Sequence, residues 1–273
     1  MVSRRLAPSR PFRLPDGAGL YHRAVATTQE RRAELTAVYR QARTCTRCPQ
    51  LASTRTQVVF GAGNANADLM FVGEAPGARE DEQGVPFVGA AGKLLGELLA
   101  EVGLSRQDVF ICNTLKCRPP GNRDPLPVEI ENCSAYLLRQ VELIQPRVIC
   151  TLGNFSTKLL SGEPTGISRL HGKAEIRVIG ARAVRLYPLF HPAAALYTRS
   201  LLETLRADFA RLPGLLALAP PEQPQRAPEP EPAPAPAIPD PQLAAVPEPA
   251  ATELDLPAPP QPESPDDRQL GLF

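Results

Sequence analysis

The feature that most constrains the fold is a short apolar run that opens into a long glycine-rich loop. The run, Leu69–Val72, is typical of a buried strand, and the loop GEAPGAREDEQGVPFVGAAG follows it at residues 73–92. A helical pattern begins directly afterwards and covers residues 93–102. Because open α/β sheets bind ligands at the carboxyl ends of their strands, we predict that residues 73–92 form an active-site loop.

Strand and helix patterns alternate through the rest of the first 212 residues. Further strand patterns lie at residues 58–60, 108–113, 147–152 and 183–190, the last within a hairpin that starts near residue 174. Helical patterns lie at residues 27–42, 127–144, 154–160 and 198–212. This alternation predicts one three-layer α/β domain over residues 27–212, with a largely parallel sheet and helices on both faces.

The two ends of the chain differ from this body. Residues 213–273 hold 18 of the 32 prolines, and 10 acidic residues against 2 basic ones. Such a composition buries too little apolar surface to fold, so we predict a disordered linker over residues 213–268. Residues 1–26 are predicted to be a disordered basic arm. The first 212 residues carry 28 Lys and Arg against 19 Asp and Glu, a surplus that is compatible with a polyanionic partner.

The chain contains no apolar run long enough to span a membrane, and its start lacks the apolar segment of a signal peptide. We therefore expect a cytoplasmic, monomeric protein of bacterial, nucleoid-associated type with no membrane partner, although composition leaves an organelle-targeting role of the arm open. In the cytoplasm, cysteines are more often metal ligands than disulfides.

The six cysteines fall into two groups. Cys112 and Cys150 lie inside apolar strand patterns and are predicted to be ordinary core residues. The other four are a C-x2-C pair, one residue in an irregular loop and one on the following helix: Cys45, Cys48, Cys117 and Cys133. Ligands with this distribution can surround one metal centre, and four thiolates suit either zinc or an iron–sulfur cluster.

Three separated motifs accompany these cysteines. They are GEAPG with PFVGAAG at residues 73–77 and 86–92, NTLKCRPPGNRDP at residues 113–125, and His191-Pro192. Together they resemble the family 4 uracil-DNA glycosylases, the iron–sulfur members of the uracil-DNA glycosylase superfamily, over about residues 30–212. The resemblance implies a four-stranded parallel sheet flanked by helices, a [4Fe-4S] cluster on the four cysteines, and excision of uracil from DNA.

The resemblance also gives roles to individual residues, and the chemistry of each fits. Phe87 would stack on uracil, Asn113 would pair with its N3–H and O4, and His191 would donate a hydrogen bond to O2. Glu74 would position water or stabilise the sugar cation, and Gly73 would allow close approach of the base. A core Phe, a turn-forming Asn and a structural His are the alternatives for the first three.

Other residues are predicted to contact DNA. Leu196 would wedge into the space left by the flipped base, with a core or capping role as its alternative. Three basic residues are predicted to contact phosphate groups: Lys116, Arg118 and Arg199. Glu80 and Asp81 match the family pattern, but a solvated acidic loop explains them equally well.

The chain ends in Gln269–Phe273, an apolar pentapeptide after the linker. It resembles the bacterial sliding-clamp-binding motif, in which a Gln and two hydrophobic residues enter a pocket on the clamp. A short peptide on a long tether fits that role, and a chance apolar end is the alternative.

These patterns together predict a monofunctional glycosylase that flips uracil out of DNA and hydrolyses its N-glycosidic bond. No Lys stands at an obvious nucleophile position, so we expect no lyase step. Two alternatives stay open: a clamp-tethered protein that binds uracil without turnover, and a structural zinc protein bound to DNA.

Overall fold

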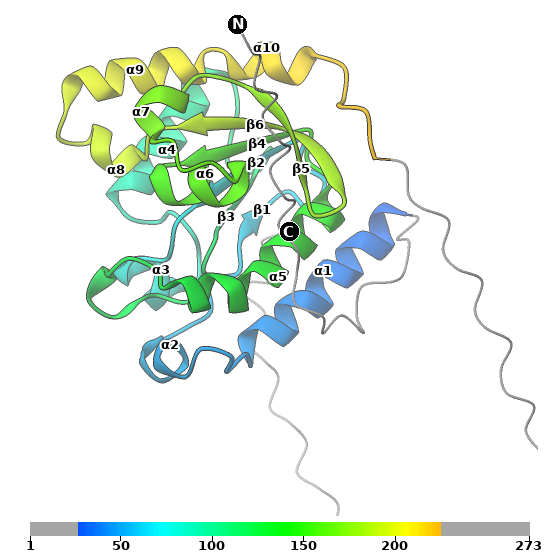
Figure 1. Ribbon diagram of the computed structural model, residues 1–273, viewed down its shortest axis with the longest axis vertical. Coiled ribbons are helices and arrows are strands. Elements are labelled where there is room, and N and C mark those ends of the chain that lie inside the picture. Colours follow the sequence, from blue (N-terminus) through cyan, green and yellow to red (C-terminus); the bar gives the residue numbers. More distant parts are fainter. Residues whose placement is uncertain (1–26, 225–273) are drawn as a thin grey trace, which may run out of the picture. The chain divides into compact units, whose positions relative to one another are not determined.

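The computed structural model describes residues 27–224, and these residues form an α/β domain. Helices cover both faces of a six-stranded sheet whose order is β1-β3-β2-β4-β6-β5 (Figure 1). The four central strands are parallel, and β1 and β5 add antiparallel edges. The predicted helix-covered sheet is confirmed, although it has two more strands than the predicted four. The predictions for the basic arm, for linker residues 225–268 and for Gln269–Phe273 lie outside the described residues.

The strands are β1 (Ala62–Gly63), β2 (Leu69–Gly73), β3 (Phe110–Asn113), β4 (Val148–Leu152), β5 (Glu175–Ile179) and β6 (Arg182–Leu189). The helices are α1 (Thr28–Arg43), α2 (Pro49–Thr54), α3 (Ala78–Gln83), α4 (Ala90–Glu101), α5 (Pro127–Ile144), α6 (Asn154–Ser161), α7 (Ile167–Leu170), α8 (Pro192–Ala195), α9 (Arg199–Phe209) and α10 (Leu212–Ala217), with a 3-10 turn at Pro120–Asn122.

The burial of the central strands explains why the sequence pattern predicted a parallel sheet. β2 pairs with β3 on one side and β4 on the other, and every residue of these three strands is buried. Parallel strands covered on both faces appear in sequence as continuous apolar runs, as these do. The register sets Gly73 opposite Asn113, so β2 and β3 end at the same level of the sheet.

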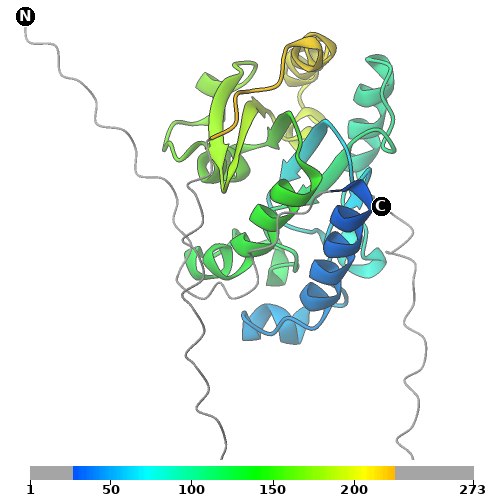
Figure 2. The same ribbon diagram turned by 90° about the vertical axis from the view of Figure 1, so that its right-hand side faces the viewer.

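Each face of the sheet has its own helical layer. On one face α1 and α5 lie side by side (Figure 2) and bury Leu35, Tyr39 and Leu137 against the strands. On the other face α4, α9 and α10 bury residues that include Leu98 and Phe209. The two apolar layers fix the sheet, and therefore fix the loops at its carboxyl edge.

Two predicted segments differ from the structure. Residues 58–60 are buried but form no regular strand, because the chain beside them has already left β3. The Val59 N–H there donates to the Lys116 carbonyl oxygen at 2.8 Å. Within the predicted active-site loop, residues 78–83 form the helix α3, which ends at Gly84 in the left-handed conformation.

The domain extends further along the chain than the predicted end at residue 212. Helix α10 starts at the fully buried Leu212, and the chain stays attached to the sheet as far as residue 224. The Gln223 side chain both accepts from the Ala183 N–H (3.1 Å) and donates to the Ala183 carbonyl oxygen (3.0 Å). The prediction of a linker from residue 213 was therefore wrong for residues 213–224, because the composition of the long tail masked the apolar stretch LPGLLAL at its start.

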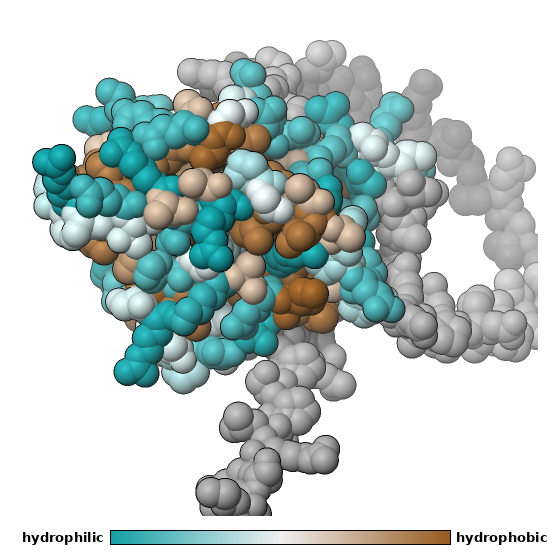
Figure 3. Space-filling view, turned by 90° about the horizontal axis from the view of Figure 1, so that it is seen from above, coloured by the Kyte–Doolittle hydropathy of each residue, from teal (hydrophilic) through white to brown (hydrophobic). Residues whose placement is uncertain are grey.

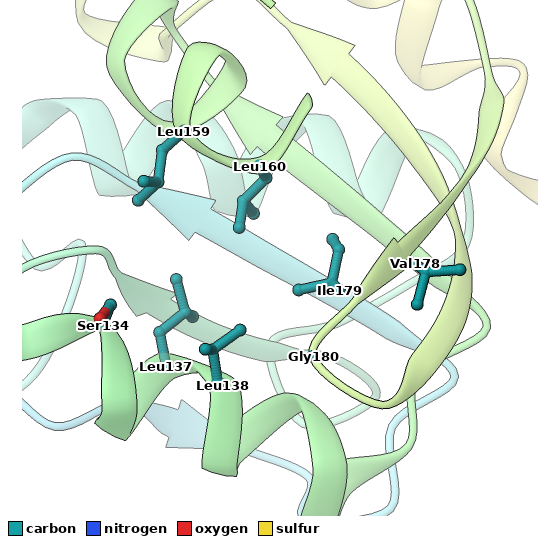
Figure 4. A pocket seen from close by; sticks show the side chains of 8 residues that line it. All are labelled: Ser134, Leu137, Leu138, Leu159, Leu160, Val178, Ile179 and Gly180. Carbon is teal, nitrogen blue, oxygen red and sulfur yellow. The ribbon is translucent and has the colours of Figure 1, made fainter. Parts of the chain in front are cut away.

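A small apolar cavity of about 70 Å³ lies between α5, α6 and the β5–β6 hairpin (Figure 4). Its lining is mostly aliphatic: Leu137, Leu138, Leu159, Leu160, Val178 and Ile179, with Ser134 and Gly180. The Ser134 hydroxyl already donates to the Glu131 carbonyl oxygen at 2.8 Å. This cavity is a gap in packing between the hairpin and the helices, without groups that could carry out chemistry.

The surface seen from the side of α9 and α10 mixes hydrophilic and hydrophobic residues (Figure 3). Scattered exposed apolar side chains such as Leu218 are normal on a folded domain. Within residues 27–224, no helix has both the length and the apolar character needed to cross a bilayer.

Candidate functional site

A cavity of about 330 Å³ opens beyond the carboxyl ends of β2, β3 and β6, a volume typical of small-molecule sites. Four of the predicted pocket residues line it: Glu74, Phe87, Asn113 and His191. The remaining lining comes from loops, from the 3-10 turn and from the helices α3, α4 and α8: Ala75, Pro76, Gly77, Glu80, Ala91, Pro119, Asn122, Arg123 and Ala193. Residues that are far apart in sequence thus meet where the fold is expected to bind ligands.

Gly73 makes room for this arrangement, because its missing side chain leaves space for two others. A Cβ atom at this position would stand 2.4 Å from Asn113 Oδ1 and 2.8 Å from Phe87 Cζ. The backbone is held as well, since the Thr114 N–H donates to the Gly73 carbonyl oxygen at 3.0 Å. The close packing of the Phe ring and the Asn amide therefore depends on glycine at the end of β2.

Replacing Gly73 with alanine should lower the rate of uracil excision, the activity that the resemblance implies, about 100-fold without unfolding the domain, because misplacing site groups by about 1 Å costs that much. The new methyl group meets only side-chain ends, so the Asn113 amide and the Phe87 ring move rather than the strand. The matched control is Gly96→Ala on α4, where no atom lies within 4 Å of the added Cβ. Single-turnover kinetics and circular dichroism of both variants test this; equal rates would contradict it.

Phe87 has an unusual backbone, with φ at 54°, a conformation that bulky residues rarely adopt. Two side chains hold it there. Glu80 Oε1 accepts from the N–H groups of Val88 and Gly89, both at 2.9 Å. Arg106 donates to the carbonyl oxygens of Phe87 (3.1 Å) and Pro86 (2.7 Å). Such strain persists only where neighbours enforce it, and it is concentrated at functional sites.

His191 follows β6 and caps α8. Its Nδ1 accepts a hydrogen bond from the Ala193 N–H at 3.1 Å, so the proton of the neutral ring must be on Nε2. Its ring stacks on Phe87 with centroids 5.6 Å apart and planes 27° apart. Burial lowers the pKa of His191 to about 4, only partly opposed by the Glu80 carboxylate. Near neutral pH the ring is therefore an uncharged donor.

Glu74 directly follows β2 and is partly buried at the cavity wall. Its carbonyl oxygen accepts from the Leu115 N–H at 3.0 Å and from the Thr114 hydroxyl, which fixes its backbone. Burial raises the pKa of its carboxyl group, and the Asp124 carboxylate raises it further. The Glu74 carboxylate therefore accepts a proton from water more readily than a fully solvated carboxylate does.

Glu80 and Asp81 are not solvated acidic residues of the loop, because both carboxylates accept backbone hydrogen bonds. Asp81 is buried, and its carboxylate oxygens accept from the Thr56 N–H at 3.1 and 3.0 Å. Together with Glu80, it ties α3 to neighbouring segments. Sequence reasoning gave no role to Arg106, since nothing local relates it to a loop twenty residues earlier.

The residues predicted to contact DNA have different surroundings. Leu196 is 39% exposed after α8, and Tyr197 beside it is 91% exposed, an aromatic that the sequence reasoning did not single out. The Arg199 side chain is almost fully exposed and faces Glu203 at 3.5 Å, while Arg118 donates to Asn122 Oδ1 at 2.8 Å.

The prediction that Lys116 contacts phosphate is wrong. Its residue exposure is 1%, and its ammonium donates to the Asn113 carbonyl oxygen and to Gln140. A basic residue between Leu115 and Cys117 looks like a surface group in sequence, but this position faces the inside of the domain.

The four predicted ligand cysteines line one pocket between the α1–α2 turn, the loop after β3, and α5. Their sulfur atoms attract donors: Arg55 reaches Cys117 Sγ at 3.2 Å, and Asn132 reaches Cys48 Sγ at 3.7 Å. Burial raises the pKa of Cys133 to about 12, whereas hydrogen bonds from Tyr136 and Arg47 outweigh burial and lower the pKa of Cys45.

Four thiol groups that line one pocket are a ligand set suited to a metal centre. In the part of the chain that the structure describes, no three His, Cys, Asp or Glu side chains are grouped so as to hold a metal ion. Positive groups and N–H donors around the sulfurs, such as Arg55, match the negative charge of four thiolates. Cys112 and Cys150 are fully buried in β3 and β4, as core residues are.

Comparison with known proteins agrees with this geometry. A family model described as the uracil DNA glycosylase superfamily matches residues 60–212. A type-4 uracil-DNA glycosylase of Archaeoglobus fulgidus is 48% identical over 179 residues, which is 64% of this chain and 89% of the relative. Type-4 enzymes of Sulfurisphaera tokodaii and Thermotoga maritima are each 47% identical, over 62% and 57% of this chain and 78% and 80% of their own lengths. The chain therefore belongs to the uracil-DNA glycosylase superfamily, within its type-4 group.

Proposed function

We propose that this chain removes uracil from DNA by hydrolysing the N-glycosidic bond, the first step of base excision repair. The observation that carries the proposal is the meeting of Phe87, Asn113 and His191 around one cavity of about 330 Å³, with Gly73 beneath them. A flat aromatic, an amide and an uncharged N–H donor suit a flipped pyrimidine that must be held, identified and released as an anion.

Recognition of the base falls to Phe87 and Asn113. Stacking of the base on the Phe87 ring contributes about 1–3 kcal/mol. The Asn113 amide accepts from uracil N3–H and donates to O4. Cytosine presents an acceptor at N3 and a donor at its exocyclic amine, so a fixed amide rejects it because buried polar groups would stay unpaired.

Bond cleavage falls to His191 and Glu74. As the C1′–N1 bond breaks, its electron pair moves onto the base, and negative charge grows at O2. The Nε2–H of His191 donates to that oxygen and stabilises the transition state more than the ground state. A water molecule attacks C1′, and its proton passes to Glu74 or to solvent, leaving an abasic sugar and free uracil.

The four predicted cysteines, Cys45, Cys48, Cys117 and Cys133, would hold a [4Fe-4S] cluster. When bound, that cluster supplies a structural link of the N-terminal helices to the loop after β3 and to α5. A zinc ion is the alternative occupant, since four thiolates suit zinc as well.

Contacts to the DNA backbone would come from Arg118 and Arg199, with Leu196 and the more exposed Tyr197 next to the cavity mouth on the α8 side. The cytoplasmic location and the monomeric state stay predictions.

The proposal is tested by incubating the protein with a uracil-containing oligonucleotide and with matched thymine and cytosine oligonucleotides, followed by alkaline cleavage. We expect strand breaks only in the uracil substrate. Retention of the uracil duplex in a gel-shift assay without any strand break would contradict turnover and support a protein that only binds uracil.

We also propose that Gln269–Phe273 binds the sliding clamp. Deleting this pentapeptide should abolish clamp binding in surface plasmon resonance, while the excision of uracil from free oligonucleotides stays unchanged, because every residue proposed for base recognition and bond cleavage lies within residues 27–224. Replacement of Gln269–Phe273 by five Gly and Ser residues is the length-matched control and should behave like the deletion. Unchanged clamp affinity after deletion would refute the proposal.

A further inference from the structure

Lys116 is a buried cation between the two parts of the site. Its side chain is among the largest fully buried ones, and its Nζ donates to the Asn113 carbonyl oxygen (2.7 Å) and to Gln140 Oε1 (2.6 Å). None of the ion pairs found within residues 27–224 includes it. A buried ammonium with only neutral partners costs several kcal/mol, so its presence calls for a nearby anion.

The cysteine pocket adjoins Lys116 and would supply such an anion once a metal centre occupies it. Lys116 lines that pocket together with the four predicted ligand cysteines, and its backbone N–H donates to Cys133 Sγ at 3.3 Å. The residue whose ammonium contacts the strand end at Asn113 therefore also lies against the cysteine pocket.

The ammonium is held in place by a network of its own. Gln140, which accepts from Nζ, donates in turn to the Phe60 carbonyl oxygen at 2.8 Å. The Lys116 carbonyl oxygen accepts from the Val59 N–H at 2.8 Å. The fixed ammonium holds the carbonyl group of Asn113 in place. It thereby also fixes the direction in which the Asn113 side chain points into the cavity.

We propose that Lys116 is both the counter-ion of the metal centre and the positioning residue for the Asn113 amide. The four thiolates of an occupied centre balance the Lys116 charge, and Lys116 transmits the presence of that centre to the base-reading end of β3. The positioning part rests on the proposed function, whereas the counter-ion part does not, because it concerns the metal centre alone.

Two variants separate the two parts. Lys116→Met removes both the charge and the contact with the Asn113 carbonyl oxygen. Gln140→Glu has nearly the same shape and neutralises the ammonium with a carboxylate at the position of Gln140 Oε1. It loses the hydrogen bond to the Phe60 carbonyl oxygen, but the new ion pair holds the ammonium in contact with Asn113 in its place. The matched control is Lys158→Met on α6, which removes an exposed lysine away from the cavity.

The readouts are iron and sulfide content, the midpoint potential by protein-film electrochemistry, and single-turnover excision of uracil. Both Lys116→Met and Gln140→Glu should shift the one-electron reduction equilibrium about tenfold towards the oxidised form, about 59 mV. Reduction adds negative charge, which the lost cation no longer balances. Only Lys116→Met should also slow excision, by about 10–100-fold, and Lys158→Met should change neither quantity.

An unchanged potential in iron-loaded Gln140→Glu would overturn the counter-ion role. Wild-type excision by folded Lys116→Met would overturn the positioning role. If Lys116→Met does not fold, Gln140→Leu replaces it, since that variant keeps the ammonium but removes the acceptor that holds it beside Asn113; wild-type excision by Gln140→Leu would then refute positioning. A wild-type protein that excises no uracil would refute the proposed function while leaving the electrochemical result valid.

Discussion

Replacing His191 with alanine should slow single-turnover excision of uracil by about 10²–10³-fold and leave the domain folded, as loss of one oxyanion donor does elsewhere. The donor is well defined here, because the Ala193 N–H occupies Nδ1 and leaves the proton on Nε2. The ring follows β6 and lines the cavity, so its loss removes a hydrogen bond and one stacking partner of Phe87 rather than core packing.

The control for this variant is His171→Ala, since His171 bonds Asp208 and lies outside the cavity lining. That change should lower stability without slowing the chemical step. Equal rates for His191→Ala and the wild type would show that His191 has no part in the reaction.

The pKa of His191 adds a pH test. Its folded-state pKa is about 4, below the ordinary value of 6.5, so the unfolded chain takes up the proton first. The wild type should therefore lose more stability than His191→Ala as the pH falls from 6.5 to about 4, measured by urea unfolding. Its excision rate should show no His191 titration between pH 6 and 8.

Replacing Cys117 with alanine should give a colourless protein with little folded yield. Structural metal centres contribute about 10 kcal/mol or more to folding, which is comparable to the whole stability of a domain. Cys117 lies at the junction of the three segments that form the pocket, so its loss also frees the α1–α2 turn from the loop after β3. Absorbance near 400 nm, iron content and thermal unfolding measure the effect.

Cys150→Ala is the matched control, because Cys150 is equally buried but lies in β4 away from the cysteine pocket. It should cost about 1–2 kcal/mol of stability and keep the colour. A colourless Cys117→Ala protein that is as stable and active as Cys150→Ala would show that the metal centre is dispensable.

The sequence predicted the central strands well because complete burial produces a simple pattern of apolar residues. β2 and β4 are covered on both faces, so Leu69–Val72 is an unbroken apolar run and Val148–Leu152 is interrupted only by Thr151. Motifs at the ends of strands then predicted which side chains would meet, since parallel strands bring their carboxyl ends to one edge. Phe87, Asn113 and His191 do line one cavity there.

What the sequence did not predict depends on contacts between distant segments. β1 is two residues long and exists only because β3 pairs with it, so no periodic pattern marks it. The positive φ of Phe87 is imposed by Glu80, on the helix α3 of the same loop, and by Arg106 from a separate segment. No sequence pattern indicated the burial of Lys116 either, because its partners Asn113 and Gln140 come from separate elements.

The pairing of Gln223 with Ala183 fastens the last described segment of the chain to the sheet. Ala183 lies near the start of β6 and His191 follows the end of that strand, so about 25 Å of strand separates this contact from the base pocket. The C-terminal part of the described domain is therefore held at the end of β6 opposite to the residues that line the cavity.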